Sequence, residues 1–318
     1  MGRSWPFKSH LRAGPSPRHW RDGAAAGGLV VAHLEAVADL SQATDAELDA
    51  LERRLAAPFM RVFPWGIILW GFANAAVWLA LWPLVLLDLM PLAVAFPIAV
   101  LNVALSYLPS HDAQHNIIAR KGHRLRWLNE LLGWASLIPL WQSFQVMRFT
   151  HYEHHRHTND PELDPDYPIH TESISGFLRE RIGAGGNDSY GAALLRIGRP
   201  DLLAQAIGYE VVYLLFLFSM AWSGYALEVA LIWWLPKHIA LLWIQFYLSW
   251  MPHHPGSEMG RYRETRAFRS IFGNILSGGM QYHIVHHLYP TIPLMQTPAA
   301  YRALRPVLER RGCDLGRL

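Results

Sequence analysis

Four long segments almost free of charged side chains constrain this chain more than any other feature of its sequence. They form two close pairs, residues 62–87 with 91–110 and residues 202–226 with 229–251. About 20 consecutive apolar residues are enough for a helix to cross the hydrocarbon of a bilayer, and in lipid only helices and closed barrels satisfy their backbone hydrogen bonds. The sequence therefore predicts an all-α integral membrane protein with four transmembrane helices.

The rest of the chain divides into an N-terminal region and the polar parts of a membrane domain. Residues 1–61 contain no long apolar run, but leucines recur at helical spacing between residues 30 and 55, where Ser41 and Thr44 are suitable helix caps. We expect a cytoplasmic arm and an amphipathic helix, or helix pair, on the membrane face, followed by one domain over residues 62–313. Within that domain, the short apolar run 131–147 predicts an interfacial or re-entrant helix.

The basic residues predict the orientation in the membrane. Of the 28 Lys and Arg residues, all but Lys237 lie in three segments: residues 1–61, 111–201 and 252–318. Since basic residues concentrate on the cytoplasmic side, we expect both termini and the central segment in the cytoplasm, with the protein in the inner (plasma) membrane. The net charge of +3 is too small to indicate a nucleic-acid partner, and a single cysteine excludes an intramolecular disulfide.

The 17 histidines are the second unusual feature. Nine of them follow a predicted span or the interfacial run, or come about thirty residues after the last span: His111 and His115; His151, His154 and His155; His253; and His283, His286 and His287. Positions i, i+3 and i+4 share one helix face, so we expect each HxxHH triplet to direct its three imidazoles to one point. Imidazole binds zinc, copper, iron and nickel, and nine imidazoles exceed the four ligands of a tetrahedral zinc. We therefore predict two metals, with iron favoured because zinc has no redox chemistry.

These histidines and their neighbours resemble the membrane fatty acid desaturase superfamily, whose hallmark is HxxxH, HxxHH and HxxHH boxes around a cytoplasmic di-iron centre. The resemblance covers about residues 62–313. In finer detail the chain is similar to the carotenoid ring hydroxylases and ketolases, on the strings HDAQH at 111–115, HRHTNDP at 155–161, MPHHP at 251–255 and HHLYPTIP at 286–293.

The resemblance implies a site and its cofactors. The nine histidines would bind two irons, with O2 as co-substrate and an external donor such as ferredoxin as the source of electrons. Relatives often carry Asp or Asn four residues before the isolated histidine, where it holds a water on one metal, whereas this chain has Ser249. Polar residues near the boxes are candidate acceptors for the distal imidazole N–H groups: Asp112, Asn159, Asp160, Asp164 and Asp166. Among the histidines left outside the ligand set are His123, His157, His170, His238 and His254.

The expected function is the oxidation of a hydrophobic lipid that enters from the bilayer. Carotenoid ring hydroxylation is the first expectation and fatty acyl desaturation the alternative, because one scaffold supports both reactions. Six aromatic residues are candidates for lining a substrate tunnel, although membrane packing explains them equally well: Trp233, Trp234, Trp243, Phe246, Tyr247 and Trp250. Two other classes are a metal transporter, for which Glu210 and Asn102 are the hints, and a non-catalytic scaffold, which would not require helical spacing in three boxes.

Overall fold

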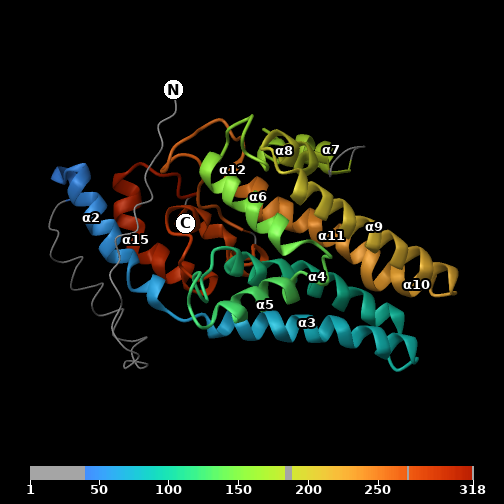
Figure 1. Ribbon diagram of the computed structural model, residues 1–318. Helices are drawn as coiled ribbons and strands as arrows, with labels where there is room; N and C mark the ends of the chain where they lie inside the picture. The colour runs from blue at the N-terminus through green and yellow to red at the C-terminus, as the bar shows by residue number, and fades with distance from the viewer. Residues whose placement is uncertain (1–39, 183–187, 271, 317–318) are drawn as a thin grey trace. The chain divides into compact units, whose positions relative to one another are not determined.

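The computed structural model describes residues 40–182, 188–270 and 272–316, and all regular structure in these ranges is helical (Figure 1). Four helices are long and apolar enough to cross a membrane: α3 (Trp65–Leu86), α4 (Leu92–Gln114), α9 (Pro200–Trp222) and the continuous stretch Ala226–His253. The prediction of an all-α membrane protein with four spans is confirmed. The predicted N-terminal arm falls on residues 1–39, outside the described residues, and the division of the chain at residue 61 stays a prediction.

The fourth span passes from α-helix to π-helix and back twice along its length. It consists of α10 (Ala226–Val229), the π-helical η4 (Ala230–Trp234), α11 (Leu235–Ile244), the π-helical η5 (Gln245–Trp250) and α12 (Met251–His253). π-Helical turns inside α-helices are rare and occur frequently at functional sites. Here η5 leads directly into α12, the short helix that ends at His253.

The helix predicted before the first span begins where expected. In α2 (Asp45–Ala56), the Thr44 hydroxyl accepts a hydrogen bond from the Glu47 amide, and the Glu47 carboxylate accepts one from the Thr44 amide. This reciprocal capping box satisfies two backbone donors that a helix start leaves free. The apolar face of α2 packs against α15 (Thr297–Arg310), as Figure 1 shows, and it buries Leu48, Leu51 and Leu55. Protein, rather than a membrane face, therefore covers the apolar side of this helix.

The spans differ in how much of their surface other helices cover. α4 packs against α3, α11 and α5 (Arg126–Ser136), and half of its apolar window is buried, compared with 11% for α9. Close approach of α5 to the next helix requires Gly133, because a Cβ there would lie 2.1 Å from the Phe144 ring. α9 instead exposes large apolar side chains, among them Leu215, Phe218 and Trp222, which suits contact with lipid.

Lys237, Glu210 and Asn102, three polar residues of the spans, each have a partner on a neighbouring helix. Lys237 is buried, with its ammonium 3.5 Å from the Glu210 carboxylate and 3.7 Å from the centre of the Tyr213 ring. Asn102 donates hydrogen bonds to the backbone and side-chain oxygens of Asn74 across the α3–α4 contact. Ionisable residues in membrane segments usually face the protein interior and pair with one another. The two hints of a transport path, Glu210 and Asn102, thus serve helix packing.

The prediction of a single helix over residues 131–147 is wrong. The chain leaves α5 at Ser136 and forms turns before α6 (Phe144–His157) begins. Ser143 caps the new helix, with its hydroxyl accepting from the Val146 amide. Pro139 in the turn has no backbone N–H to donate to a helical hydrogen bond. The remaining elements are shorter: η1 (Leu40–Gln42), η2 (Phe59–Arg61), η3 (Tyr167–Ile169), α7 (Ile174–Ile182), α8 (Asp188–Arg196), α13 (Gly273–Leu276), η6 (Met280–Tyr282), α14 (His283–Leu288) and η7 (Leu294–Gln296).

Candidate metal centre

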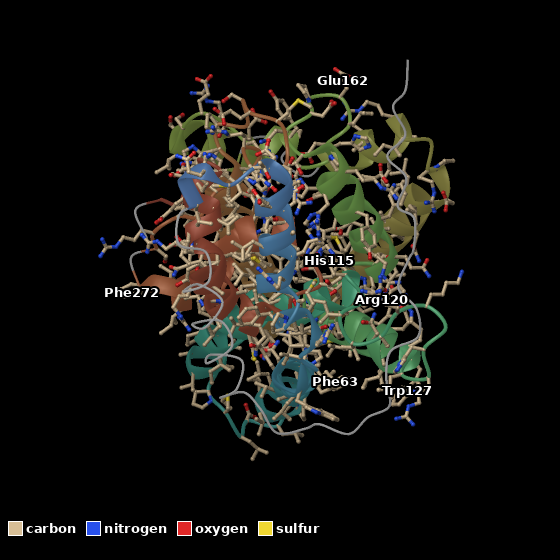
Figure 2. All side chains as sticks on the ribbon, turned by 90° about the vertical axis from the view of Figure 1, so that its left-hand side faces the viewer. Phe63, His115, Arg120, Trp127, Glu162 and Phe272 are labelled. Carbon is tan, nitrogen blue, oxygen red and sulfur yellow. The ribbon has the colours of Figure 1, made fainter. Side chains whose placement is uncertain are left out.

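The structure brings all nine predicted histidines together from four separate elements. His111 and His115 come from the C-terminal end of α4, His253 from α12, and the two triplets from α6 and α14. All nine are buried or half-buried, and Figure 2 shows His115 in the interior, with Glu162, Trp127 and Phe272 at the periphery. Histidines as far apart in the sequence as His111 and His287 therefore share one interior site.

The nine imidazoles divide into two groups. The first imidazole group contains His111, His115, His151 and His286, and the second contains His154, His253, His283 and His287; in each, one ligand atom per residue lies within 4.8 Å of the others. His155 joins the first group, because its Nε2 lies 3.2 Å from Nε2 of His151 and 2.9 Å from Nε2 of His286. Its ring also stacks on His287 at 4.2 Å between centroids, so His155 lies where the two groups meet.

Each HxxHH triplet is split between the two groups, so the expectation that a triplet points to one place is wrong. His151 and His155 belong to the first group while His154 belongs to the second; in the other triplet, His283 and His287 belong to the second and His286 to the first. At 3.6 residues per turn, positions i and i+4 are about 40° apart around the helix, but i+3 and i+4 differ by about 100°. The spacing that we expected to direct three imidazoles to one point thus directs them to two adjacent groups.

The chemistry of these buried nitrogens fits bound cations. Neutral imidazole has one donor and one acceptor nitrogen, yet Nε2 of His151 lies 2.8 Å from Nε2 of His115 and 3.2 Å from Nε2 of His155. Other buried imidazole nitrogens have no hydrogen-bond partner: both of His111, both of His287, Nε2 of His253 and Nε2 of His283. A buried polar atom without a partner is costly, and one cation in each group would satisfy one nitrogen of each of these imidazoles.

Asp164 is the predicted outer acceptor that the structure supports most directly. It lies on the loop after α6 and accepts a hydrogen bond from Nδ1 of His154 at 2.9 Å, which leaves Nε2 for the second group. Burial alone would lower the pKa of His154, but Asp164 and Asp166 raise it to about 9. The carboxylate is itself held by the backbone amides of Asn159 and Asp166, each at 2.8 Å. Such a carboxylate fixes the tautomer and orientation of a metal-binding imidazole.

The other predicted acceptors have different positions. Asp112 accepts from the Leu294 amide and lies 3.8 Å from Nδ1 of His111, beyond hydrogen-bond distance. Asp166 accepts from the Tyr190 hydroxyl at 2.5 Å, with its second oxygen 3.9 Å from Nδ1 of His154.

The remaining two candidates serve the loop itself. Asn159 adopts a left-handed conformation (φ 64°) just after α6. Its side-chain amide donates to the backbone carbonyls of Glu258 and Glu264. Asp160 accepts from the amides of its own turn, at Glu162 and Leu163.

One residue that contacts the second imidazole group could not have been found from the sequence. Glu264 belongs to the loop after the fourth span, and its carbonyl accepts from Nδ1 of His253 at 3.1 Å. Its carboxylate lies 3.6 Å from Nδ1 of His287. No motif marks this position, because it reaches the second group only through the course of a non-helical loop.

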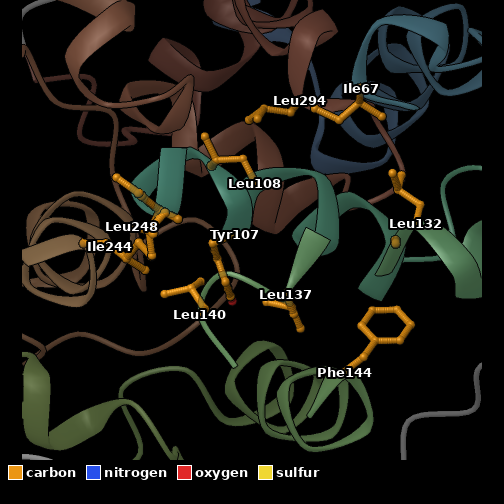
Figure 3. Close-up of a cluster of buried hydrophobic side chains, with 14 of the residues drawn as sticks. Ile67, Tyr107, Leu108, Leu132, Leu137, Leu140, Phe144, Ile244, Leu248 and Leu294 are labelled. Atoms are coloured by element: carbon orange, nitrogen blue, oxygen red, sulfur yellow. The ribbon is translucent and has the colours of Figure 1, made fainter. Parts of the chain in front are cut away.

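A cavity opens onto both imidazole groups. The space between its lining residues is about 580 Å³, open solvent included. His111 and His151 line it from the first group, and His154 and His283 from the second. Figure 3 shows Tyr107 near Ile244 and Leu248, residues through which the apolar core continues into the cavity wall. The cavity is therefore largely apolar at its walls and imidazole-rich at its base.

The six aromatic residues proposed for a tunnel do not line this cavity as the described residues define it. The indole of Trp233 donates to the Pro139 carbonyl, that of Trp243 to the Leu276 carbonyl, and that of Trp250 to the Thr171 carbonyl. These hydrogen bonds join the fourth span to neighbouring loops. Packing, the alternative explanation, accounts for these three tryptophans.

An all-helical membrane fold with two imidazole groups beneath one cavity defines the class: a membrane protein with a histidine-rich site suited to two metals. The family model described as fatty acid desaturase matches residues 89–315 of this chain. The chain belongs to the fatty acid desaturase family.

The curated relatives include enzymes with two kinds of substrate. The chain is 24% identical over 229 residues to a zeaxanthin 4-ketolase of Chlamydomonas reinhardtii, covering 67% of this chain and 44% of the ketolase. It is 24% identical over 232 residues to an sn-1 oleoyl-lipid 12-desaturase of Anabaena variabilis (63% of this chain, 64% of the desaturase). It is 27% identical over 202 residues to a beta-carotene ketolase of a Paracoccus species (61% and 72%). The match spans less than two thirds of the first two relatives.

Proposed function

We propose that this chain is an O2-dependent membrane oxidoreductase that uses two irons to oxidise a hydrophobic lipid, and that the lipid is a carotenoid oxygenated at its end ring, first by hydroxylation. The observation that carries the proposal is the cavity whose base is formed by histidines of both groups. Two irons bound there would supply dioxygen activation for the oxidation of an unactivated C–H bond. The nine histidines hold the metals, Asp164 orients His154, and the apolar walls position the substrate and limit access of water.

Two findings support the carotenoid substrate. The strings around His253 and after His287 resemble carotenoid enzymes, and two of the three relatives described above are ketolases named for carotenoids. The walls also carry the polar side chains of Gln142 and Gln245 among apolar residues, and such groups can hydrogen-bond the hydroxyl that ring hydroxylation introduces, which an alkene product lacks. Fatty acyl desaturation is the second candidate, because the Anabaena relative acts on an oleoyl lipid by name.

Expression in a carotenoid-accumulating host tests the substrate. Analysis of pigments and fatty acids from the same cells should show a more polar pigment whose mass has increased by oxygen, and a His286→Ala chain should leave the pigments unchanged. A keto pigment would mean that the same ring carbon is oxidised twice. Unchanged pigments with new double bonds in the fatty acids would favour the acyl alternative, and no change in either would refute the proposal.

We also propose that the site faces the cytoplasm of a cell whose inner membrane holds the protein, with a ferredoxin-type donor as reductant. The distribution of Lys and Arg supports this orientation, and the histidines of α4 and α12 lie at the ends of their membrane segments. A reporter fused after Leu318 should behave as cytoplasmic and one inserted at Asp88 as external. The opposite pattern would separate the site from cytoplasmic reductants.

A further inference from the structure

The two imidazole groups are unequal, and the difference leaves a coordination position to be filled. With His155, the first group has five imidazoles, whereas the second has four. Ser249 lies one helical turn before His253 and lines the cavity beside His154 and His283. Its hydroxyl is therefore an uncharged oxygen that the fourth span offers in the same cavity as two histidines of the second group.

His170, which the sequence gave no reason to include, lies directly against this hydroxyl. Its Nε2 is 3.2 Å from Oγ of Ser249, and its ring stacks on His253 with 4.7 Å between centroids and 19° between planes. The side chain is fully buried. Its Nδ1 has no hydrogen-bond partner and lies 4.0 Å from the Asp164 carboxylate. A buried imidazole with one unsatisfied nitrogen, packed on a metal-site histidine, is an unusual group to retain for packing alone.

The surrounding chain holds His170 in this place from two sides. Gly256 adopts φ +73°, and a Cβ at this glycine would lie 2.8 Å from Cβ of His170 and 3.2 Å from its carbonyl oxygen. On the other side, the Trp250 indole donates to the carbonyl of Thr171, the next residue, at 2.9 Å. Both anchors belong to the segment around His253, so His170 and His253 are positioned together.

We propose that His170 is a positioning residue of the second metal: its Nε2 accepts the Ser249 hydroxyl proton, and Oγ of Ser249 then holds a water in the remaining coordination position. This inference rests on the proposed di-metal function. A serine hydroxyl alone is a rotatable and weak acceptor, and the hydrogen bond to a fixed imidazole gives it one orientation. The pair His170–Ser249 would thus complete the second group, which has one imidazole fewer than the first.

Cobalt(II) substitution tests the pair without turnover, because Co(II) absorbs visible light more strongly as its coordination number falls. Ser249→Ala and His170→Phe should each still bind about two Co(II) per chain, but with stronger absorption from one ion. Affinity for that ion should fall about 10- to 100-fold, as for other groups that orient metal ligands. The double variant Ser249→Asn/His170→Phe should regain the original spectrum, because an amide oxygen holds the water without help from an imidazole.

His157→Phe is the matched control, because His157 lies on the same α6 helix as three site histidines but contacts Glu153 instead. Its spectrum should equal that of the unmodified protein. An unchanged spectrum in His170→Phe, or a loss of both ions that Ser249→Asn does not restore, would overturn the inference. These results are distinct from failure of the proposed function, which would appear as no bound Co(II) in the unmodified protein or as no oxidised lipid in cells.

Discussion

The two imidazole groups are held in different ways. Around the first, imidazole nitrogens from α4, α6 and α14 contact one another at 2.8–3.2 Å. Around the second, imidazoles contact oxygens from loops: His154 contacts Asp164, His253 the Glu264 carbonyl, and His287 the Glu264 carboxylate. Helix geometry thus builds most of the first group, whereas the second also depends on two non-helical loops. Substitutions outside the histidines should therefore affect the second group more.

Removing a metal-site histidine should have the largest effect on metal content and turnover, and the effect should be the same for either imidazole group. Replacing His155 in the first group or His154 in the second with Ala should abolish turnover and reduce the bound metal from about two ions per chain to about one. Metal analysis of the purified chain and a dioxygen-consumption assay measure this. His123→Ala, an exposed histidine far from both groups, is the control. A fully active protein with stoichiometric zinc and no iron would contradict the iron assignment.

Removing an outer carboxylate should separate the two groups. Asp164→Asn replaces the charged partner of His154 Nδ1, so metal affinity of the second group should fall about 10- to 100-fold while the first group keeps its metal. Asp112→Asn should cost less, because Asp112 makes no hydrogen bond to His111. Competition with a chelator measures both affinities, and Asp160→Asn controls for charge in the same loop. Equal losses of metal affinity from both groups after Asp164→Asn would show that the two groups do not differ in their dependence on loops.

The sequence predicted the four spans and the meeting of nine histidines, because both depend on local patterns. Long apolar runs predict the spans, and the i, i+3, i+4 spacing marks the histidines. It could not separate Asp164 from Asp160, since the course of the loop after α6, which includes the left-handed Asn159, brings Asp164 to His154. It also gave no indication of His170 or Glu264, whose positions depend on loops that pack against distant elements. The parts of the site built by loops were therefore the parts that the sequence left open.

The pH dependence of metal binding should also differ between the groups. Asp164 raises the pKa of His154 to about 9 against the effect of burial, so a metal entering the second group must displace a proton below that pH. Burial and neighbouring imidazoles hold the pKa values of His151, His155 and His286 well below 6.5. These are already neutral at pH 7 and above.

This competition between metal and proton sets the direction in which metal affinity changes with pH. Between about pH 7 and pH 9, affinity of the second group should rise about tenfold per pH unit, while that of the first stays flat. Co(II) titration of the metal-free chain at several pH values measures this, and Asp164→Asn should flatten the second slope. Two equal slopes would contradict the assignment of the proton to His154.

The smallest effect should come from Glu52, on α2, outside the segment matched by the family model. This buried carboxylate accepts hydrogen bonds from the hydroxyls of Tyr289 (2.8 Å) and Tyr262 (3.0 Å) and pairs with Arg261 at 2.9 Å. Tyr289 follows His287 by two residues, and Arg261 precedes Glu264 by three. The N-terminal helix therefore braces both chain segments that support the second group.

Glu52→Gln should lower the stability of the folded protein by only about 1 kcal/mol, because the amide oxygen still accepts a hydrogen bond while the charge on a half-exposed Arg261 loses its partner. Metal should leave the second group a few-fold faster, with little change at the first, since Glu52 hydrogen-bonds Arg261, Tyr262 and Tyr289 and no histidine of the first group. Thermal unfolding in detergent and the rate of metal release to a chelator measure the two effects. Glu47→Gln on the exposed side of the same helix is the matched control. Faster release from the first group, or from both equally, would mean that α2 supports the whole fold and that the loops around the second group have no separate role.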